Sequence, residues 1–295
     1  MKRGDFLSHV GWTGAGIAYA MTAEGLLAGR ALGAGPMADA PLFVQISDSH
    51  IGFHQVANPD VGATFKASID AINALALQPR FVVHTGDVTH LAKNEQFDTA
   101  KQFLGTLRAR TVVLPGEHDT IGSDPDVFYK HFGRPAGSAG WYSWDEAGIH
   151  FVALVNVFDF EKMGLLGSEQ LAWLERDLRG VPTTTPVVAF AHVPLYALYP
   201  EWGWTTEDGA KALALLARFD RVTVLNGHIH QVITHVEGNI RFATAAATAY
   251  PQPAPGTAPK PGPLTLPHDD LLRAIGYRRV TLNDGVADLD DRKLG

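Results

Sequence analysis

The chain of 295 residues contains no cysteine. Disulfide bonds, thiol catalysis and cysteine-bound zinc are therefore excluded. No stretch of the sequence reaches the roughly 18 strongly apolar residues of a membrane-spanning helix, so we expect no permanent membrane span. Basic residues are outnumbered, 24 against 31 acidic ones, and form no stripe, so we expect no nucleic-acid partner held through its phosphates. The sequence gives no indication of oligomeric state.

Histidine and apolar residues are abundant. Hydrophobic residues make up 46% of the chain, which is enough to build a large core. The 13 histidines are an unusual feature of the composition and indicate metal binding.

Residues 1–40 differ from the rest of the chain. Lys2 and Arg3 precede a stretch without charge from residue 10 to residue 23, and a run of small residues ends at Ala40. This order is typical of an export signal, and it resembles a twin-arginine signal with Lys2 in the place of the first arginine. We expect a periplasmic or exported protein. The alternative is a soluble helical arm on a cytoplasmic protein, and in either case residues 41–295 form the functional domain.

Short apolar strands alternate with amphipathic helices after residue 41. The pattern predicts strands at 42–46, 81–83 and 111–114, separated by helices at 64–77 and 95–107. Strands and helices in this order are typical of a parallel sheet with right-handed crossovers. We therefore expect an α/β fold.

The second half of the chain repeats this alternation less regularly. We expect strands at 150–154, 187–190 and 222–225, and a helix at 168–178 with Ser168 as its N-cap. Residues 251–263 contain six prolines and two glycines, which predicts a loop. Two short strands around Asn283-Asp284-Gly285 are expected at 277–289.

The predicted strands end in side chains that bind metals. These residues are Asp48 and His50, Asp87, Glu117 with His118 and Asp119, His192, and finally His228 and His230. Because the carboxyl ends of parallel strands meet at one edge of a sheet, we expect the side chains to converge. Carboxylates mixed with imidazoles suit Zn, Fe, Mn or Co, and the set is larger than one tetrahedral ion needs. The sequence therefore predicts two metal ions.

In their order along the chain, these blocks resemble the calcineurin-like metallophosphoesterases. That family has the pattern Asp-x-His, Gly-Asp, Gly-Asn-His-Asp, a lone His, and Gly-His-x-His. The matches here are Asp48/His50, Gly86/Asp87, Gly116/His118/Asp119, His192 and Gly227/His228/His230. The resemblance spans residues 41 to about 245 and is strongest to bacterial cyclic-nucleotide and glycerophosphodiester phosphodiesterases. It implies a four-layer α/β/β/α sandwich of two mixed sheets flanked by helices.

The resemblance also implies a ligand set for two divalent transition-metal ions, Fe, Mn or Zn. One ion would be held by Asp48, His50, Asp87 and His230. Asp87 would bridge to a second ion, which is also held by His192 and His228. Glu117 stands where the family has the asparagine ligand. It would either bind the second metal directly, favouring harder ions, or bind it through water, or disrupt the site.

The activity implied is hydrolysis of a small-molecule phosphate ester, with a phosphodiester favoured over a monoester. A metal-bridging hydroxide would attack phosphorus, and His118 would assist the leaving group. Asp119 would orient His118 through its other ring nitrogen. The alternatives are a hydrolase of nucleotides or pyrophosphate-linked lipids, and a non-catalytic metallophosphoesterase-like module that binds a metal or a partner.

Some residues outside the blocks have two readings. His54 and His90 follow metal blocks closely and would support a ligand or contact substrate, or else be structural. Trp202, Trp204, Tyr196 and Tyr199 form either an aromatic wall for a substrate or ordinary loop packing.

Overall fold

The computed structural model describes residues 20–22, 25–27, 41–122, 124–283 and 285–295. The chain divides into two units, Met1–Asp39 and Ala40–Gly295. In the first unit, β1 (Ala20–Thr22) pairs antiparallel with β2 (Gly25–Leu27), so these six residues are extended and not the helix weighed for an N-terminal arm. The rest of the expected export signal or arm lies outside the described residues.

The first sheet of the second unit carries the predicted crossover pattern. Its strand order is β13-β12-β3-β4-β5, with β3, β4 and β5 parallel and β12 and β13 forming an antiparallel hairpin. The strands are β3 (Phe43–Ile46), β4 (Phe81–His84), β5 (Arg110–Val113), β12 (Gly276–Asn283) and β13 (Val286–Lys293). The crossovers are the helices α1 (Val61–Asn73) and α2 (Asn94–Leu104).

The second sheet has the order β10-β11-β9-β8-β7-β6. Strands β7, β8, β9 and β11 are parallel, and the edge strands β6 and β10 run antiparallel to their neighbours. The strands are β6 (Tyr142–Glu146), β7 (Ile149–Ala153), β8 (Val187–Ala191), β9 (Val222–Asn226), β10 (Thr234–Glu237) and β11 (Ile240–Thr244). The α-helices that follow α2 are α3 (Pro125–Phe132), α4 (Gly167–Arg179), α5 (Gly209–Leu216) and α6 (His268–Ala274).

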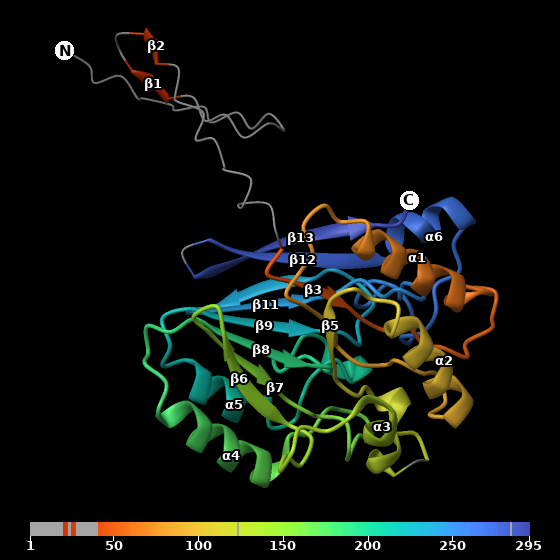
Figure 1. Cartoon of the computed structure of the whole chain (residues 1–295), viewed down its shortest axis with the longest axis horizontal. Coiled ribbons are helices and arrows are strands. Elements are labelled where there is room, and N and C mark those ends of the chain that lie inside the picture. Colours follow the sequence, from red (N-terminus) through yellow and green to blue (C-terminus); the bar gives the residue numbers. More distant parts are fainter. Residues whose placement is uncertain (1–19, 23–24, 28–40, 123, 284) are drawn as a thin grey trace. The chain divides into compact units, whose positions relative to one another are not determined.

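Three apolar layers hold these elements together, as alternation along the strands predicts. Between the sheets, Phe43 stacks on Phe81 at 5.0 Å and meets Phe190 of the other sheet edge-on at 5.5 Å. Val44 points the other way and packs with residues of α1 and α2, while a third cluster joins the second sheet to α4 and α5. The expected four-layer α/β/β/α sandwich is confirmed (Figure 1).

The start of α4 differs from the prediction. The helix begins at Gly167, so Ser168 lies inside it and is not the N-cap. The backbone amides of Leu166 and Gly167 instead donate to the two carboxylate oxygens of Asp208, each at 2.9 Å. A carboxylate at this end satisfies free amides and complements the helix dipole, and here it comes from the segment before α5.

Two other expectations concern the chain after β11. Residues 251–267 contain no helix or strand, so the proline-rich segment is a loop as predicted; we call it the strap. Within the described residues, no helix is long and apolar enough to cross a membrane.

Candidate metal centre

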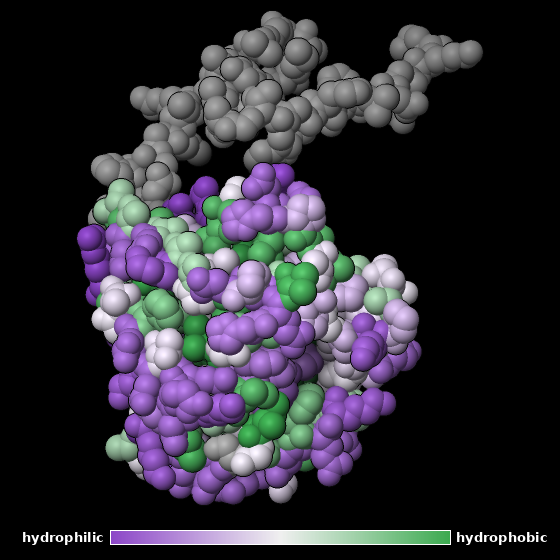
Figure 2. All heavy atoms as spheres, turned by 90° about the vertical axis from the view of Figure 1, so that its right-hand side faces the viewer, coloured by the Kyte–Doolittle hydropathy of each residue, from purple (hydrophilic) through white to green (hydrophobic). Residues whose placement is uncertain are grey.

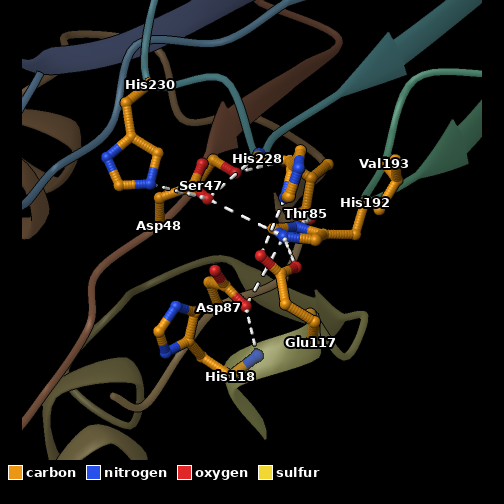
Figure 3. Close-up of polar contacts among 12 residues, drawn as sticks. Ser47, Asp48, Thr85, Asp87, Glu117, His118, His192, Val193, His228 and His230 are labelled. Atoms are coloured by element: carbon orange, nitrogen blue, oxygen red, sulfur yellow. Dashed lines mark hydrogen bonds and ion pairs between the residues drawn. The ribbon is translucent and has the colours of Figure 1, made fainter. Parts of the chain in front are cut away.

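The predicted ligand residues lie at the carboxyl ends of strands from both sheets. Asp48 and His50 follow β3, Asp87 follows β4, and Glu117 begins the short 3-10 turn Glu117–Asp119 after β5. From the second sheet, His192 follows β8, and His228 and His230 follow β9. The parallel strands of both sheets thus direct residues far apart in sequence to one place (Figure 3).

A first group of side chains comprises Asp48, His50, Asp87 and His230. Each offers one ligand atom, these atoms all lie within 4.8 Å of one another, and all four residues are buried. Nε2 of His230 lies 3.1 Å from Nε2 of His50 and 3.4 Å from Oδ1 of Asp48. Two carboxylates and two imidazoles converge here, in the donor set that the family resemblance implies for one ion.

A second group comprises Glu117, His192 and His228. Oε2 of Glu117 lies 2.8 Å from Nε2 of His192, and Oε1 lies 2.8 Å from Nδ1 of His228. The longer side chain of glutamate therefore reaches the place between the two imidazoles. Of the three alternatives for Glu117, this position favours direct binding of a metal.

Asp87 lies between the two groups. Its Oδ2 is 3.5 Å from Nε2 of His50, and its Oδ1 is 3.5 Å from Nε2 of His192. One oxygen thus faces each group, which is the geometry that a bridging carboxylate requires.

The free donor atoms show that the residues fit metal ions. Asp48 Oδ2, Glu117 Oε2, His192 Nε2 and His228 Nδ1 are buried without a hydrogen-bond partner. Buried polar atoms are rarely left unpaired, because each costs roughly 1–3 kcal/mol. Ligand bonds of about 2.0–2.1 Å at tetrahedral angles place donor atoms about 3.3 Å apart, close to the separations observed here. The unpaired atoms therefore suit ligands whose lone pairs point at a shared ion.

Two ligand imidazoles are oriented through their other nitrogen. Nδ1 of His192 donates to the carbonyl oxygen of Thr85 at 2.7 Å, and Nδ1 of His230 donates to that of Tyr250 at 2.7 Å. A neutral imidazole that donates at Nδ1 leaves the lone pair of Nε2 free. Both rings thus present Nε2 to the centre.

The backbone at the ligands is in an unusual conformation. Positive φ angles in the left-handed region occur at Asp48 (52°), His50 (43°), Asp87 (54°), His228 (67°) and His230 (56°). Residues other than glycine avoid this region, and each such position stores of order 1–3 kcal/mol of strain. Five of the seven predicted ligands share this strain, which is typical of a functional site.

Two glycines allow the ligand segments to approach one another. A Cβ atom on Gly86, whose φ is +105°, would lie 2.4 Å from Nδ1 of His192. A Cβ atom on Gly116 would lie 2.1 Å from Oδ1 of Asp87. Neither distance is tolerable for carbon, so only glycine fits at these two positions.

The charges in the second group are complementary. Burial would raise the pKa of Glu117, but the imidazoles of His228 and His192 outweigh burial and hold that pKa well below its usual value. The pKa of Asp48 is likewise lowered to about 2, because His230 and His192 outweigh its burial. Both carboxylates are thus ionised.

His118 lies beside the centre, but Asp119 does not orient it as predicted. Nδ1 of His118 lies 2.8 Å from the carbonyl oxygen of His90, which therefore accepts its hydrogen bond. The Asp119 carboxylate instead accepts hydrogen bonds from the amides of Val88, Thr89 and Gly116 and from the Thr89 hydroxyl. Asp119 is committed to these donors because they surround it, and its role is to fasten the turns after β4 and β5 together.

The burial of His118 lowers its pKa, but the nearby carboxylates of Asp87 and Glu117 outweigh that effect and raise it above the usual value. The backbone amide of His118 also donates to Oδ1 of Asp87 at 2.9 Å. His118 is thus attached to the Asp87 carboxylate through its backbone and keeps Nε2 available.

A cavity of about 390 Å³ opens over the two groups. Its apolar walls come from Phe53, Phe160, Trp202, Trp204 and Tyr250, and the strap contributes Pro261, Gly262 and Pro263. Lys162 adds a cation to the lining. Figure 2 shows the face toward which β7, β8 and β9 run, and a hollow lies among its mostly hydrophilic side chains.

The aromatic residues that follow His192 divide between the two predicted roles, a wall for the substrate and ordinary loop packing. Trp202 and Trp204 line the cavity, whereas Tyr196 packs on Phe242 at 4.6 Å and Tyr199 meets Trp202 edge-on at 5.2 Å. His54 is exposed and contacts the carbonyl of Pro59, so it has no place in the site. His90 lines the cavity.

Sequence reasoning missed Phe160, Lys162 and Tyr250. The first two lie in the irregular segment after β7, and Tyr250 immediately precedes the strap. None of them stands in a motif, so no signal in the sequence could place them. Tyr250 stacks on His50 at 5.1 Å and therefore covers a predicted ligand.

This fold and this convergence of carboxylates and imidazoles define a metal-dependent phosphoric ester hydrolase. Residues 41–232, more than half of the chain, match the family model of the calcineurin-like phosphoesterases. The chain belongs to that family.

Curated relatives carry phosphodiesterase names. The chain is 27% identical over 226 residues to a probable glycerophosphodiester phosphodiesterase of Arcobacter nitrofigilis, covering 71% of this chain and 79% of that protein. It is 24% identical to a 3',5'-cyclic-nucleotide phosphodiesterase of Nostoc sp., covering 70% and 77% respectively. Among solved structures, a dimetal phosphatase from Danio rerio shares the fold with a TM-score of 0.66 at 14% identity, covering 86% of this chain and 97% of that one.

Proposed function

We propose that this chain hydrolyses phosphodiesters at a centre of two divalent transition-metal ions. Asp48, His50 and His230 hold one ion, Glu117, His192 and His228 hold the other, and Asp87 bridges them. Each ion then has one carboxylate and two imidazoles of its own, and the two ions share the carboxylate of Asp87. The observation that carries the proposal is the position of Glu117, whose two oxygens each lie 2.8 Å from a histidine nitrogen.

The charge of Glu117 moves the preference of the centre toward a phosphodiester, compared with an amide at the same position. Three ionised carboxylates around two divalent ions leave a net charge of about +1, where an amide in place of Glu117 would leave about +2. A phosphodiester is a monoanion, whereas a phosphomonoester carries about −1.5 to −2 at neutral pH. Electrostatic attraction for the dianionic monoester is therefore weaker at the less positive centre. The centre then discriminates less against the monoanionic diester.

The shape of the cavity also suits a diester. A diester carries an organic group on each side of its phosphate, and the cavity extends beyond the ligand residues along aromatic side chains. Phe160 and Trp202 offer flat apolar faces to one such group. The organic groups of the substrate are thus bound by side chains that no family motif contains.

The metal ions and the residues around them have different roles in the proposed reaction. Bound divalent ions supply Lewis acidity toward the phosphoryl oxygens and lower the pKa of water in the centre. His118 is held through Nδ1 by the His90 carbonyl, so its Nε2 remains free to give a proton to the leaving oxygen. Asp87 fixes the position of His118 by accepting a hydrogen bond from its backbone amide.

The test compares bis(p-nitrophenyl) phosphate with p-nitrophenyl phosphate on the wild type and on Glu117→Asn. We expect the wild type to have the higher kcat/KM on the diester, and Glu117→Asn to shift the ratio toward the monoester by about tenfold. Glu175→Gln, an exposed substitution on α4 that also removes one negative charge, serves as the control. Hydrolysis of neither ester after reconstitution with Mn²⁺, Fe²⁺ or Zn²⁺ would contradict the proposal.

A further inference from the structure

His90 contacts both the predicted metal ligand His50 and the proposed leaving-group histidine His118. Its ring stacks on that of His118, with centroids 5.0 Å apart and planes inclined by 17°. It also meets the ring of His50 at 5.5 Å with an angle of 63°. Its main-chain carbonyl accepts the hydrogen bond from Nδ1 of His118. His90 stands outside the sequence blocks that predict the metal ligands and follows Asp87 by three positions.

His50 differs from the other ligand histidines in how its ring is oriented. Its Nε2 faces Asp87 and His230, so a metal-binding His50 keeps the lone pair there and carries its proton on Nδ1. His192 and His230 donate this second proton to backbone carbonyls. For His50, the contact that the structure shows at Nδ1 is Nδ1 of His90, at 3.4 Å.

This contact has one chemically consistent form. A nitrogen that accepts the His50 proton must have a free lone pair, so His90 carries its own proton on Nε2. Both rings are then neutral, and each has a defined tautomer. An acceptor behind a ligand histidine fixes the orientation of the ring and raises its basicity toward the metal.

We propose that His90 is a positioning residue, which accepts the Nδ1 proton of His50 and thereby holds Nε2 of His50 toward the first metal ion. Through its carbonyl and its stacked ring it also fixes the plane of His118. One side chain and its backbone thus couple the orientation of a metal ligand to that of the leaving-group histidine. The inference rests on the proposed metal centre.

Two substitutions of His90 test its hydrogen-bond acceptor and its aromatic ring independently. Asparagine at position 90 places Oδ1 near the site of Nδ1 and can accept the same proton, but it has no ring. Phenylalanine keeps an aromatic ring against His118 but has no acceptor. Both variants retain the backbone carbonyl that binds His118.

The decisive readout is metal affinity, measured on the full chain by titration with Zn²⁺ against a competing chelator. Loss of the hydrogen-bond partner behind a ligand typically lowers metal affinity about 10–100-fold. We therefore expect His90→Phe to lower the affinity of the chain for one of the two ions by that factor. We expect His90→Asn to bind both ions within about threefold of the wild type. His54→Phe, at an exposed histidine outside the site, should leave both affinities unchanged.

A spectroscopic measurement supports the titration. With Co²⁺ in place of Zn²⁺, the visible absorption of His90→Phe should differ from that of the wild type, and His90→Asn should restore it. The proposal is overturned if His90→Phe binds both ions like the wild type, or if His90→Asn is as weak as His90→Phe. A wild-type chain that binds fewer than two ions would instead contradict the proposed function, so the two failures are distinguishable.

Discussion

Nε2 of His192 lies 2.8 Å from Oε2 of Glu117, yet neither atom has a hydrogen-bond partner, because they are not directed at each other as a hydrogen bond requires. Both atoms are buried. This relationship is the one expected of two ligands of the same ion, whose lone pairs converge on a point between them. It makes Glu117 the residue on which the properties of the second metal position depend.

The first prediction concerns product inhibition. Glu117→Asn removes a negative charge close to the phosphate site, and at about 4 Å a pair of unit charges interacts by about 1–4 kcal/mol at effective dielectric constants of about 80–20. We expect inorganic phosphate to inhibit the variant about tenfold more strongly. The measurement is the competitive inhibition constant against bis(p-nitrophenyl) phosphate, and equal constants for variant and wild type would show that Glu117 is not a ligand.

The second prediction tests the close approach at Gly116. A Cβ atom there would lie 2.1 Å from Oδ1 of Asp87, so Gly116→Ala must displace the Asp87 carboxylate. We expect the variant to lose at least one metal ion per chain. Gly180→Ala is the matched control, since its φ is −86° and no atom lies within 4 Å of the added carbon. Full metal content in Gly116→Ala would refute the crowding argument.

The third prediction concerns the corrected role of Asp119. Its carboxylate accepts four hydrogen bonds, and an asparagine would turn an NH₂ group toward backbone N–H donors. Buried donors without acceptors are costly, so Asp119→Asn should lower the free energy of unfolding by about 2–4 kcal/mol. Urea unfolding in the presence of a chelator measures this without a contribution from metal binding. The exposed substitution Asp220→Asn should cost under about 0.5 kcal/mol. Similar losses in both variants would argue against a fastening role for Asp119.

The fourth prediction is a pH dependence of stability that arises away from the metal centre. Nδ1 of His150 lies 2.8 Å from Asp145, and its Nε2 lies 2.9 Å from Asp177. Burial lowers the pKa of His150, but the hydrogen bonds to Asp177 and Asp145 outweigh burial and raise it above its usual value. A raised pKa stabilises the folded state below the unfolded value of about 6.5, and this stabilisation is lost as the pH rises through the folded value.

We therefore expect His150→Gln to reduce the free energy of unfolding more at pH 6 than at pH 9. Urea unfolding of wild type and variant with chelator present, at both pH values, measures the difference. The other titrating groups are common to both proteins and cancel. An equal loss at both pH values would mean that the charged form of His150 does not contribute.

The ligand set could be predicted because its members stand at the ends of apolar strands. Asp48, Asp87 and His192 each follow a short apolar strand that is readable in the sequence, and the topology of an α/β sheet then brings them together. The same local reasoning located the five strands of the first sheet, strands β7, β8 and β9 of the second sheet, and the proline-rich strap, but it missed β6, β10 and β11. Such predictions succeed where one segment carries the whole signal.

The sequence could not assign partners that come from distant segments. Asp208 caps α4 from about 40 positions away, so the local N-cap pattern at Ser168 was misleading. Asp119 stands beside His118 in the sequence, yet the donors that surround its carboxylate include Val88 and Thr89, about 30 positions earlier. Each of these pairings depends on how turns pack in three dimensions, and residue type alone does not determine that.

We infer that this chain holds two metal ions at the carboxyl ends of the strands of its two sheets, and that Glu117 binds one of them. Elemental analysis of protein purified without chelator or metal-affinity tag tests it most directly, with Glu117→Ala measured beside the wild type. We expect close to two transition-metal ions per wild-type chain and close to one in the variant. One ion or none in the wild type, or two ions in both proteins, would contradict it.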